Sequence, residues 1–417
     1  MLVRNALFVT APALLTLSLA ACGPGEASSF GGGGASTTTA TAGSGGTGGA
    51  FESPPWLEDA HVLVSRLTEN VDCTTDICRH NENTDLLNWQ GAIWLVHRTA
   101  KSQILGPNSS LRISKSTDGG KTFDLQSIVK APTPEPDGRD IRDPHFYVVG
   151  DTLYIKTLCR LPVLSTQDSD VDTWPMFMSS KDGVTWTPLE TYTDGAGTVW
   201  NTHSFWRIRE REGVYYSAAY KDGDQSVTLF SSTDGVVWQK GADVYAVAED
   251  TPLETELTFM PSGKLLALVR MDGTSDELLG TQGRLRTKIC WSDPPYDAFD
   301  CPDEFMGQRL DGPLSFFHDG RLFVVARRHL GMDGRKRTSL FEITGDLEGG
   351  KLEIKEWGDL PSAGDTSYAG VADIDEDHAL LTWYAGDLEL DEQWLFGMLA
   401  PTDIWQGTVD FTKLVSP

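Results

Sequence analysis

The chain has 417 residues, a formal net charge of −26 at pH 7 and 40% hydrophobic residues. A field of that sign repels nucleic acid and anionic lipid head groups, so we expect neither as a partner. An anionic ligand would therefore need a local pocket of positive charge.

The N-terminus is typical of an export signal. Met1–Ala21 carries one positive charge and then an apolar run that is too short to span a membrane. The run ends in Leu-Ala-Ala-Cys, which resembles the lipobox of bacterial lipoproteins; the alternative is an ordinary secretory signal. The resemblance implies that Cys22 is lipidated and that the exported protein sits in the bacterial cell envelope, touching the membrane through its lipid anchor only.

Residues 22–55 separate this signal from the folded part. They are dominated by Gly, Ser, Thr and Ala, which cannot build a core, so we expect a flexible tether. Residues 56–417 show no further break in composition, and we expect one domain there.

Cysteine spacing predicts two local disulfides, because an exported protein can keep close pairs oxidised. The pairs are Cys73 with Cys78 and Cys290 with Cys301. Cys159 is left over, and we expect a buried thiol at the end of a strand.

A pattern of strand, turn and apolar strand recurs six times after residue 80. The turns lie at Gly91, Gly150, Gly213, Gly263, Gly320 and near Asp377. Each copy is followed by a third strand and often a fourth, which predicts an all-β fold, a six-bladed β-propeller. The segment from Trp56, "WLEDAHVLVSRL", is expected to supply the outer strand of the last blade and so close the ring.

Three segments repeat Ser-x-Asp-(x)-Gly-x-x-aromatic, at residues 116–123, 180–186 and 232–238. Asp and Gly at these positions are explained by hairpin turn chemistry. Such Asp boxes mark a family, and from about residue 60 the chain resembles the bacterial sialidases and related exported propellers.

Equivalent positions in related blades should form a ring around the axis. Seven residues after each turn stand Arg98, Thr157, Tyr220, Arg270, Arg327 and Tyr384. Three arginines facing one cavity would bind a carboxylate; the alternative is three separate structural ion pairs. Sialidases hold the substrate carboxylate with an arginine triad, so the resemblance implies Arg98 and Arg270 plus Arg327, or instead Arg337 or Arg335.

Nine residues before the turns stand Glu82, Ile141, Ser204, Glu254, Asp311 and Tyr368. Both ends of each hairpin reach the central mouth, so Glu254 and Tyr368 are expected to meet across it. The family's nucleophile is a tyrosine paired with a glutamate, which the resemblance carries onto these two residues. We also expect the arginines to lower the pKa of the Tyr368 phenol.

The usual general acid of the family is an aspartate six residues before the first Asp box, and Ser110 stands there. Asp143 in "GRDIRDPHF" is the expected substitute, with Asp140 and Arg142 beside it at the mouth. Asp143 could instead cap a turn and pair with Arg142. Glu82 and Asp311 are weaker substitutes.

These patterns predict a retaining exo-glycosidase of sialidase type, monomeric and without a cofactor, acting on terminal sialic or related acidic sugars of glycans. One alternative is a propeller that binds anionic glycans without catalysis; another is an enzyme for a different ulosonic acid. The histidines show no ligand spacing, so we expect no metal site.

Overall fold

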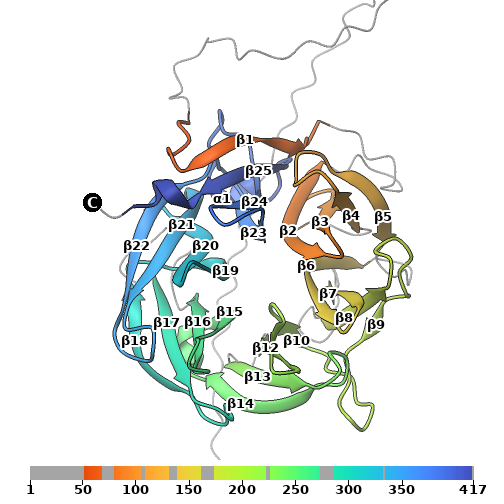
Figure 1. The fold of residues 1–417 in the computed structure, drawn as a ribbon, viewed down its shortest axis with the longest axis vertical. Helices are drawn as coiled ribbons and strands as arrows, with labels where there is room; N and C mark the ends of the chain where they lie inside the picture. Colours follow the sequence, from red (N-terminus) through yellow and green to blue (C-terminus); the bar gives the residue numbers. More distant parts are fainter. Residues whose placement is uncertain are drawn as a thin grey trace, which may run out of the picture. The chain divides into compact units, whose positions relative to one another are not determined.

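The protein is described by a computed structural model that covers residues 51–67, 79–104, 109–130, 139–160, 173–221, 226–272, 285–331 and 334–415. Six antiparallel sheets stand in a ring around a central axis, as the sequence predicted (Figure 1). Within each sheet the strand nearest the axis is followed along the chain by strands progressively further out, which is the arrangement of a β-propeller.

We number the sheets as blades 1 to 6 in chain order. Blade 1 contains β2 (His80–Trp89), β3 (Ala92–Ala100), β4 (Ser110–Ser116) and β5 (Asp124–Lys130). Blade 2 contains β6 (Asp140–Val149), β7 (Thr152–Arg160), β8 (Trp174–Ser180) and β9 (Glu190–Thr191). Blade 3 contains β10 (His203–Phe205), β11 (Arg209–Arg211), β12 (Val214–Lys221), β13 (Ser226–Ser232) and β14 (Gln239–Tyr245).

The remaining blades follow the same order. Blade 4 contains β15 (Pro252–Phe259), β16 (Leu265–Met271), β17 (Arg286–Ser292) and β18 (Asp300–Met306). Blade 5 contains β19 (Asp311–His318), β20 (Arg321–His329), β21 (Lys336–Gly345) and β22 (Leu352–Asp359). Blade 6 contains β23 (Thr366–Asp373), β24 (His378–Ala385), β25 (Asp403–Asp410) and β1 (Leu57–Val64).

The described helices are short: α1 (Trp394–Gly397) and the 3₁₀ turns η1 (Ala248–Asp250) and η3 (Phe411–Lys413). None is long and apolar enough to cross a membrane.

Blade 6 is closed by the first strand of the domain, as the sequence predicted. β1 pairs with β25 in antiparallel register, with Leu57 opposite Val409 and Val64 opposite Ile404. The Trp56 side chain, 3% exposed, donates from its ring nitrogen to the Trp357 carbonyl oxygen of blade 5 at 3.0 Å. The two ends of the domain are thereby joined in one sheet, so blade 6 has four strands.

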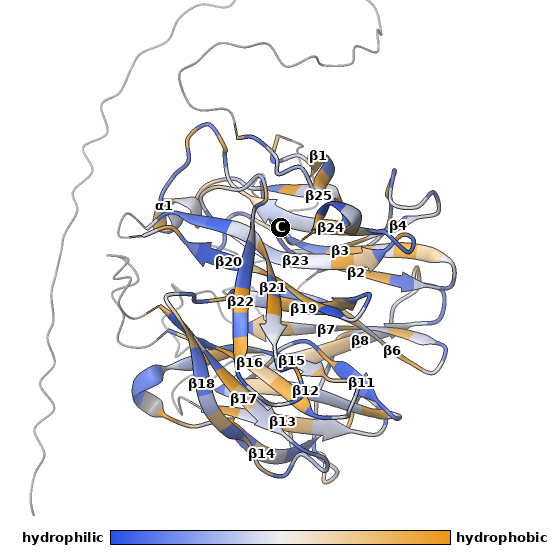
Figure 2. Ribbon diagram, turned by 60° about the vertical axis from the view of Figure 1, so that its left-hand side comes forward, coloured by the Kyte–Doolittle hydropathy of each residue, from blue (hydrophilic) through white to orange (hydrophobic). Residues whose placement is uncertain are grey.

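Apolar side chains lie mainly between neighbouring blades, and Figure 2 shows the hydrophobic colour within strands rather than loops. Between blades 1 and 2, for example, Trp94 and Val96 of β3 pack with Leu153 and Ile155 of β7, and each is at most 1% exposed. Burial of both faces explains why the second strands of the blades, such as β16 and β24, are nearly continuous in hydrophobic residues. Packing between blades fixes the inner strands around the axis and so positions whatever they carry at the mouth.

The Asp-box turns are held by their own side chains. In the second, Ser180 Oγ donates to Asp182 Oδ1 at 2.9 Å and accepts from the Gly183 N–H at 2.8 Å. Gly183 has φ +73°, and a Cβ there would lie 2.0 Å from the Trp94 ring of blade 1. The glycine is therefore required by both the turn and the packing between blades.

Cysteine placement agrees with the sequence where the chain is described. Cys290 of β17 and Cys301 of β18 form a disulfide with a Cα–Cα distance of 4.0 Å. Cys159 is a buried thiol in β7. Cys22, Cys73 and Cys78 lie outside the described residues.

We predict that Gly183→Ala lowers the free energy of unfolding by about 3 kcal/mol or more, because a positive φ and an immobile indole ring both oppose the new methyl group. Gly91→Ala is the matched control. Its φ is +74° but no atom lies within 4 Å of the added Cβ, so about 1–2 kcal/mol is expected. Urea denaturation measures both values, and equal losses would contradict the role assigned to Trp94.

Candidate functional site

The inner strands share an irregularity at the end nearest the mouth. Their register breaks between Glu82/Asp85, Arg142/His145, Pro252/Thr255, Asp311/Leu314 and Ser367/Gly370. In four of these β-bulges the first extra residue has a left-handed backbone: Asn83 (φ 53°), Asp143 (φ 49°), Gly312 (φ 57°) and Tyr368 (φ 46°). A bulge turns a side chain out of the normal alternation, and non-glycine residues in this conformation are uncommon outside functional sites.

A cavity of about 300 Å³ lies at this mouth. Its charged lining residues are Glu82, Arg142, Asp143, Arg160, Glu254, Arg270, Asp272 and Arg327. Tyr220, Tyr368, Tyr384 and Trp394 add aromatic surface. A larger surface hollow, about 450 Å³, is lined by a single charged residue, Asp373, and so offers far less chemistry.

Tyr368 and Glu254 meet in the cavity, in the geometry that the repeat register predicted. The Tyr368 hydroxyl donates to Glu254 Oε1. Glu254 Oε2 accepts from Arg270 Nη1 at 2.7 Å and from the Gly312 N–H at 2.8 Å. Both side chains are mostly buried, 8% and 6% exposed, so these hydrogen bonds hold them in one orientation.

The two groups keep opposite protonation states. Burial alone would raise the pKa of Glu254, but Arg270, the Tyr368 hydrogen bond and Arg327 outweigh it, and the pKa lies below its ordinary value. Burial, and then the Glu254 carboxylate, raise the pKa of Tyr368 well above its usual 10. Our expectation of a lowered phenol pKa is therefore wrong: Arg327 and Arg270 oppose these effects only in part. A neutral phenol beside an ionised carboxylate is the arrangement of a nucleophile with its base.

Arg270 and Arg327 line the cavity on either side of this pair. Arg327 Nη1 lies 3.1 Å from Asp365 Oδ1, and its guanidinium carbon lies 5.5 Å from the centre of the Tyr368 ring. The alternatives for the third arginine do not line the cavity. Arg337 and Arg335 pair with Asp391 at 2.8 and 3.4 Å.

Arg98 is a correction to the expected triad. It is fully buried, donates to Asp140 Oδ1 at 2.8 Å and to Glu82 Oε1, and is absent from the cavity lining. Asp140 is likewise buried and not at the cavity surface, contrary to expectation. The cause is local charge neutralisation, since Glu82 lies opposite Arg98 on the paired strand and fixes it behind the wall.

Arg142 occupies the wall in front of Arg98. It reaches Glu82 Oε1 at 3.2 Å, Asp140 Oδ2 at 3.3 Å and the Gln103 carbonyl oxygen at 2.7 Å. Arg142 and Asp140 are thus neighbours, as expected, but the side chain exposed to the cavity is the arginine.

Asp143 lines the cavity and accepts a hydrogen bond from Asn83 Nδ2. Burial raises its pKa above the ordinary value; Arg142 and Lys156 oppose this in part, while Glu254 and Glu82 add to it. A raised pKa makes a carboxyl group better suited to serve as an acid. Glu82 and Asp311 cannot, because neighbouring cations hold the pKa of each below its usual range.

Asp311 is the hub of the cationic wall. It is fully buried, and its carboxylate lies 2.6 Å from Arg309 Nε, 2.9 Å from His329 Nε2 and 3.3 Å from both Arg270 Nε and Arg327 Nε. Lys336 Nζ lies 3.8 Å from the same carboxylate, so five positive or protonatable side chains of the described residues share it.

Counting from the turns missed several lining residues. Arg160 lies three positions beyond the residue that the offset selected in blade 2, and Asp272 two positions beyond Arg270. Trp394, in α1, lies outside the repeated pattern, so the repeat could not identify it as a lining residue. Arg160 could have been found, because it is the last residue of an apolar strand that ends at the mouth.

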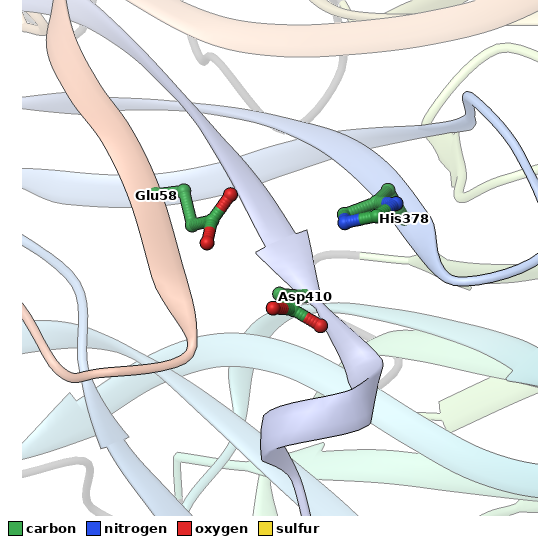
Figure 3. A group of neighbouring side chains, drawn as sticks. All are labelled: Glu58, His378 and Asp410. Carbon is green, nitrogen blue, oxygen red and sulfur yellow. The ribbon is translucent and has the colours of Figure 1, made fainter.

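Two groups of described side chains have the composition of metal ligands. Glu58, His378 and Asp410 gather on the outer strands of blade 6 (Figure 3). Lys413 contacts Glu58 and lies 3.2 Å from Asp410, so an ammonium group already supplies the positive charge there. His80, Glu82 and Asp365 form the second group, but both carboxylates are already bound by arginines. Neither group therefore carries an argument for a metal ion.

No protein-family model matches this chain, and no protein of curated function does. A crystal structure of a protein of unknown function from Dyadobacter fermentans DSM 18053 superposes with a TM-score of 0.61 at 17% identity, over 85% of this chain and 99% of that one.

Two sialidases are also similar. Trypanosoma rangeli sialidase in complex with 2,3-difluorosialic acid gives a TM-score of 0.59 at 14% identity, over 84% of this chain and 58% of that one. NanB sialidase from Streptococcus pneumoniae gives a TM-score of 0.59 at 11% identity, over 85% of this chain and 71% of that one. This chain thus spans somewhat more than half of the trypanosomal protein. At such identities the likeness shows the fold, a six-bladed sialidase-like propeller.

We predict that Asp311→Asn lowers the free energy of unfolding at pH 7 by about 3–5 kcal/mol, because it removes a fully buried carboxylate that several buried cations share and leaves an excess of positive charge there. The folded pKa of Asp311 lies well below 3.8, so its contribution is full above that pH and is lost as the pH falls further. The difference from the wild type should therefore shrink in acid.

Denaturation curves between pH 3 and 8 test this prediction. Asp319→Asn, in an exposed turn, is the control and should change little. A loss at pH 7 no greater than that of the control would refute the hub role.

Proposed function

We propose that this protein is a retaining exo-glycosidase of sialidase type that removes a terminal sialic or related acidic sugar from glycans. The observation that carries the proposal is the buried hydrogen bond between the Tyr368 hydroxyl and the Glu254 carboxylate, inside a cavity that Arg270 and Arg327 also line. We further propose that the protein acts as an exported lipoprotein of the bacterial cell envelope, a role that rests on the sequence around Cys22.

In the first step the Tyr368 oxygen attacks the anomeric carbon while the bond from that carbon to the leaving oxygen breaks. Glu254 takes the phenolic proton, for which its ionised state suits it. Asp143 gives its proton to the leaving oxygen. In the second step Asp143 accepts a proton from water, water cleaves the tyrosyl–sugar bond, and Glu254 returns the proton to Tyr368.

A phenol is suited to this substrate for an electrostatic reason. The anomeric carbon of a sialoside carries a carboxylate, which would repel a carboxylate nucleophile but not a neutral hydroxyl group. Arg270 and Arg327, next to Tyr368, would orient the substrate carboxylate.

A propeller that binds anionic glycans without catalysis is the second candidate. The observation that favours it is Ser110, which stands where sialidases carry the acid, is buried and does not line the cavity. This second candidate function predicts that the protein binds an anionic glycan but does not cleave it.

We predict that Tyr368→Phe lowers kcat for a soluble fluorogenic sialoside by about 10³-fold or more, since it removes the nucleophile without removing the ring. Tyr154→Phe, on the outer part of blade 2, is the control and should leave kcat unchanged. Turnover by the Tyr368→Phe variant at the wild-type rate would refute the mechanism. Absence of turnover in the wild type, with sialic acid still raising Tm, would favour the binding candidate.

Asp143→Asn should lower kcat/KM by about 10²–10⁴-fold. An acid must be protonated to act, so the wild-type rate should fall as the pH rises through the raised pKa of Asp143. The variant should lose this limb of the pH–rate profile. A substrate with a leaving group that needs no proton should be cleaved almost equally by both proteins; an unchanged profile would exclude Asp143 as the acid.

A further inference from the structure

We propose that Arg160 supplies the unneutralised positive charge with which the cavity binds the anionic group of its ligand, the role that Arg98 was expected to share. This inference deepens the proposed function, because it names a binding residue of the same site. Arg160 is the last residue of β7 and lines the cavity beside Leu158 and Tyr220.

The other cavity arginines each pair with two or three carboxylates. Arg142 pairs with Glu82 and Asp140, Arg270 with Glu254, Asp272 and Asp311, and Arg327 with Asp311 and Asp365. Their charges are therefore largely cancelled before any ligand arrives.

Arg160 differs from them. Asp140 is its partner in strand register, yet among the described residues no carboxylate lies within 4.0 Å of its guanidinium nitrogens. Its Nε, like that of Arg142, is buried without a hydrogen-bond acceptor. A buried N–H of a charged group that lacks an acceptor is costly, and a bound anion would remove that cost. The guanidinium is the cavity group for which a ligand carboxylate is the missing partner.

The surroundings of Arg160 support this assignment. Burial and the nearby Arg142 guanidinium lower the pKa of Arg160, and Asp140, Tyr220 and Asp143 only partly oppose them. An anion between the two guanidinium groups would relieve both effects, because each would gain a counter-charge.

Arg160 and Arg327 lie on opposite sides of the ring of blades. Blade 2, which carries Arg160, lies three blades from blade 5, which carries Arg327, and so faces it across the six-membered ring (Figure 1). A ligand that reaches both arginines must span the cavity. The cavity therefore suits a compact acidic sugar, with polar groups directed to opposite walls, better than an isolated inorganic anion.

The experiment compares charged and neutral forms of one ligand. N-acetylneuraminic acid, its methyl ester, 3-deoxy-octulosonic acid and glucuronic acid are titrated against the wild type, Arg160→Gln and Arg160→Lys by calorimetry and by Tm. Arg211→Gln, at the turn end of the inner hairpin of blade 3 and outside the cavity lining, is the control.

We expect the wild type to prefer at least one acid over the neutral ester. In Arg160→Gln that preference should fall about tenfold or more, the Lys variant should recover part of it, and the Arg211 control should keep it. Binding of the acid by the wild type should also weaken with added salt more than binding by Arg160→Gln.

An unchanged preference in Arg160→Gln would overturn the inference, and so would failure of all three acids to bind the wild type. Neither result tests the proposed function, which the turnover assay tests separately. If the wild type cleaves no sialoside but binds an acid through Arg160, the proposed function is wrong and the inference stands.

Discussion

The mouth of this propeller depends on the neutralisation of buried charge. An unpaired buried charge is costly, so the arginines of the mouth meet carboxylates from their own or a neighbouring blade, and Arg160 is the exception among the described lining residues. The resulting chain of contacts passes from blade 5 through blade 6 to blades 1 and 2. Its successive members are Arg309, Asp311, Arg327, Asp365, His80, Glu82, Arg142 and Asp140.

His80 joins the two halves of this chain. Its Nε2 lies 3.2 Å from Glu82 Oε2 and 3.7 Å from Asp365 Oδ2, while Nδ1 lies 2.7 Å from the Ala400 carbonyl oxygen. Because the Ala400 carbonyl oxygen can only accept a hydrogen bond, Nδ1 is the donor in that contact. The walls that carry Arg142 and Arg327 are thus connected behind the cavity, which keeps the distance between them fixed.

Much of this architecture could be predicted from the sequence, because blades related by rotation repeat the same local sequence features. Apolar strands recur in each blade, turn glycines in five repeats and Asp boxes in three, so the six blades and the closing strand from Trp56 could be predicted. The meeting of Glu254 with Tyr368 could also be predicted, since both ends of a hairpin reach the mouth.

Other features could not be predicted by counting residues. The offset selects Thr157, which is buried and donates to the Arg142 carbonyl oxygen, whereas the cavity is lined by Arg160 at the end of the same strand. Arg98 stands at the expected offset from its turn, but its ion pair with Glu82 holds the side chain away from the cavity. An offset counted along the chain takes no account of such a partner. The pKa of Tyr368 depends on its burial, which the residue type alone does not reveal.

The closure of blade 6 has a kinetic consequence. β1 is synthesised before the other five sheets and its partner β25 after them, with Leu57 and Val409 opposite each other in the finished register. Such a distant pairing requires the closing of a very long loop, so the ring should join late and slowly during folding. Until it does, β25 presents an open edge on which a second nascent chain could add, and the speed of ring closure therefore competes with aggregation.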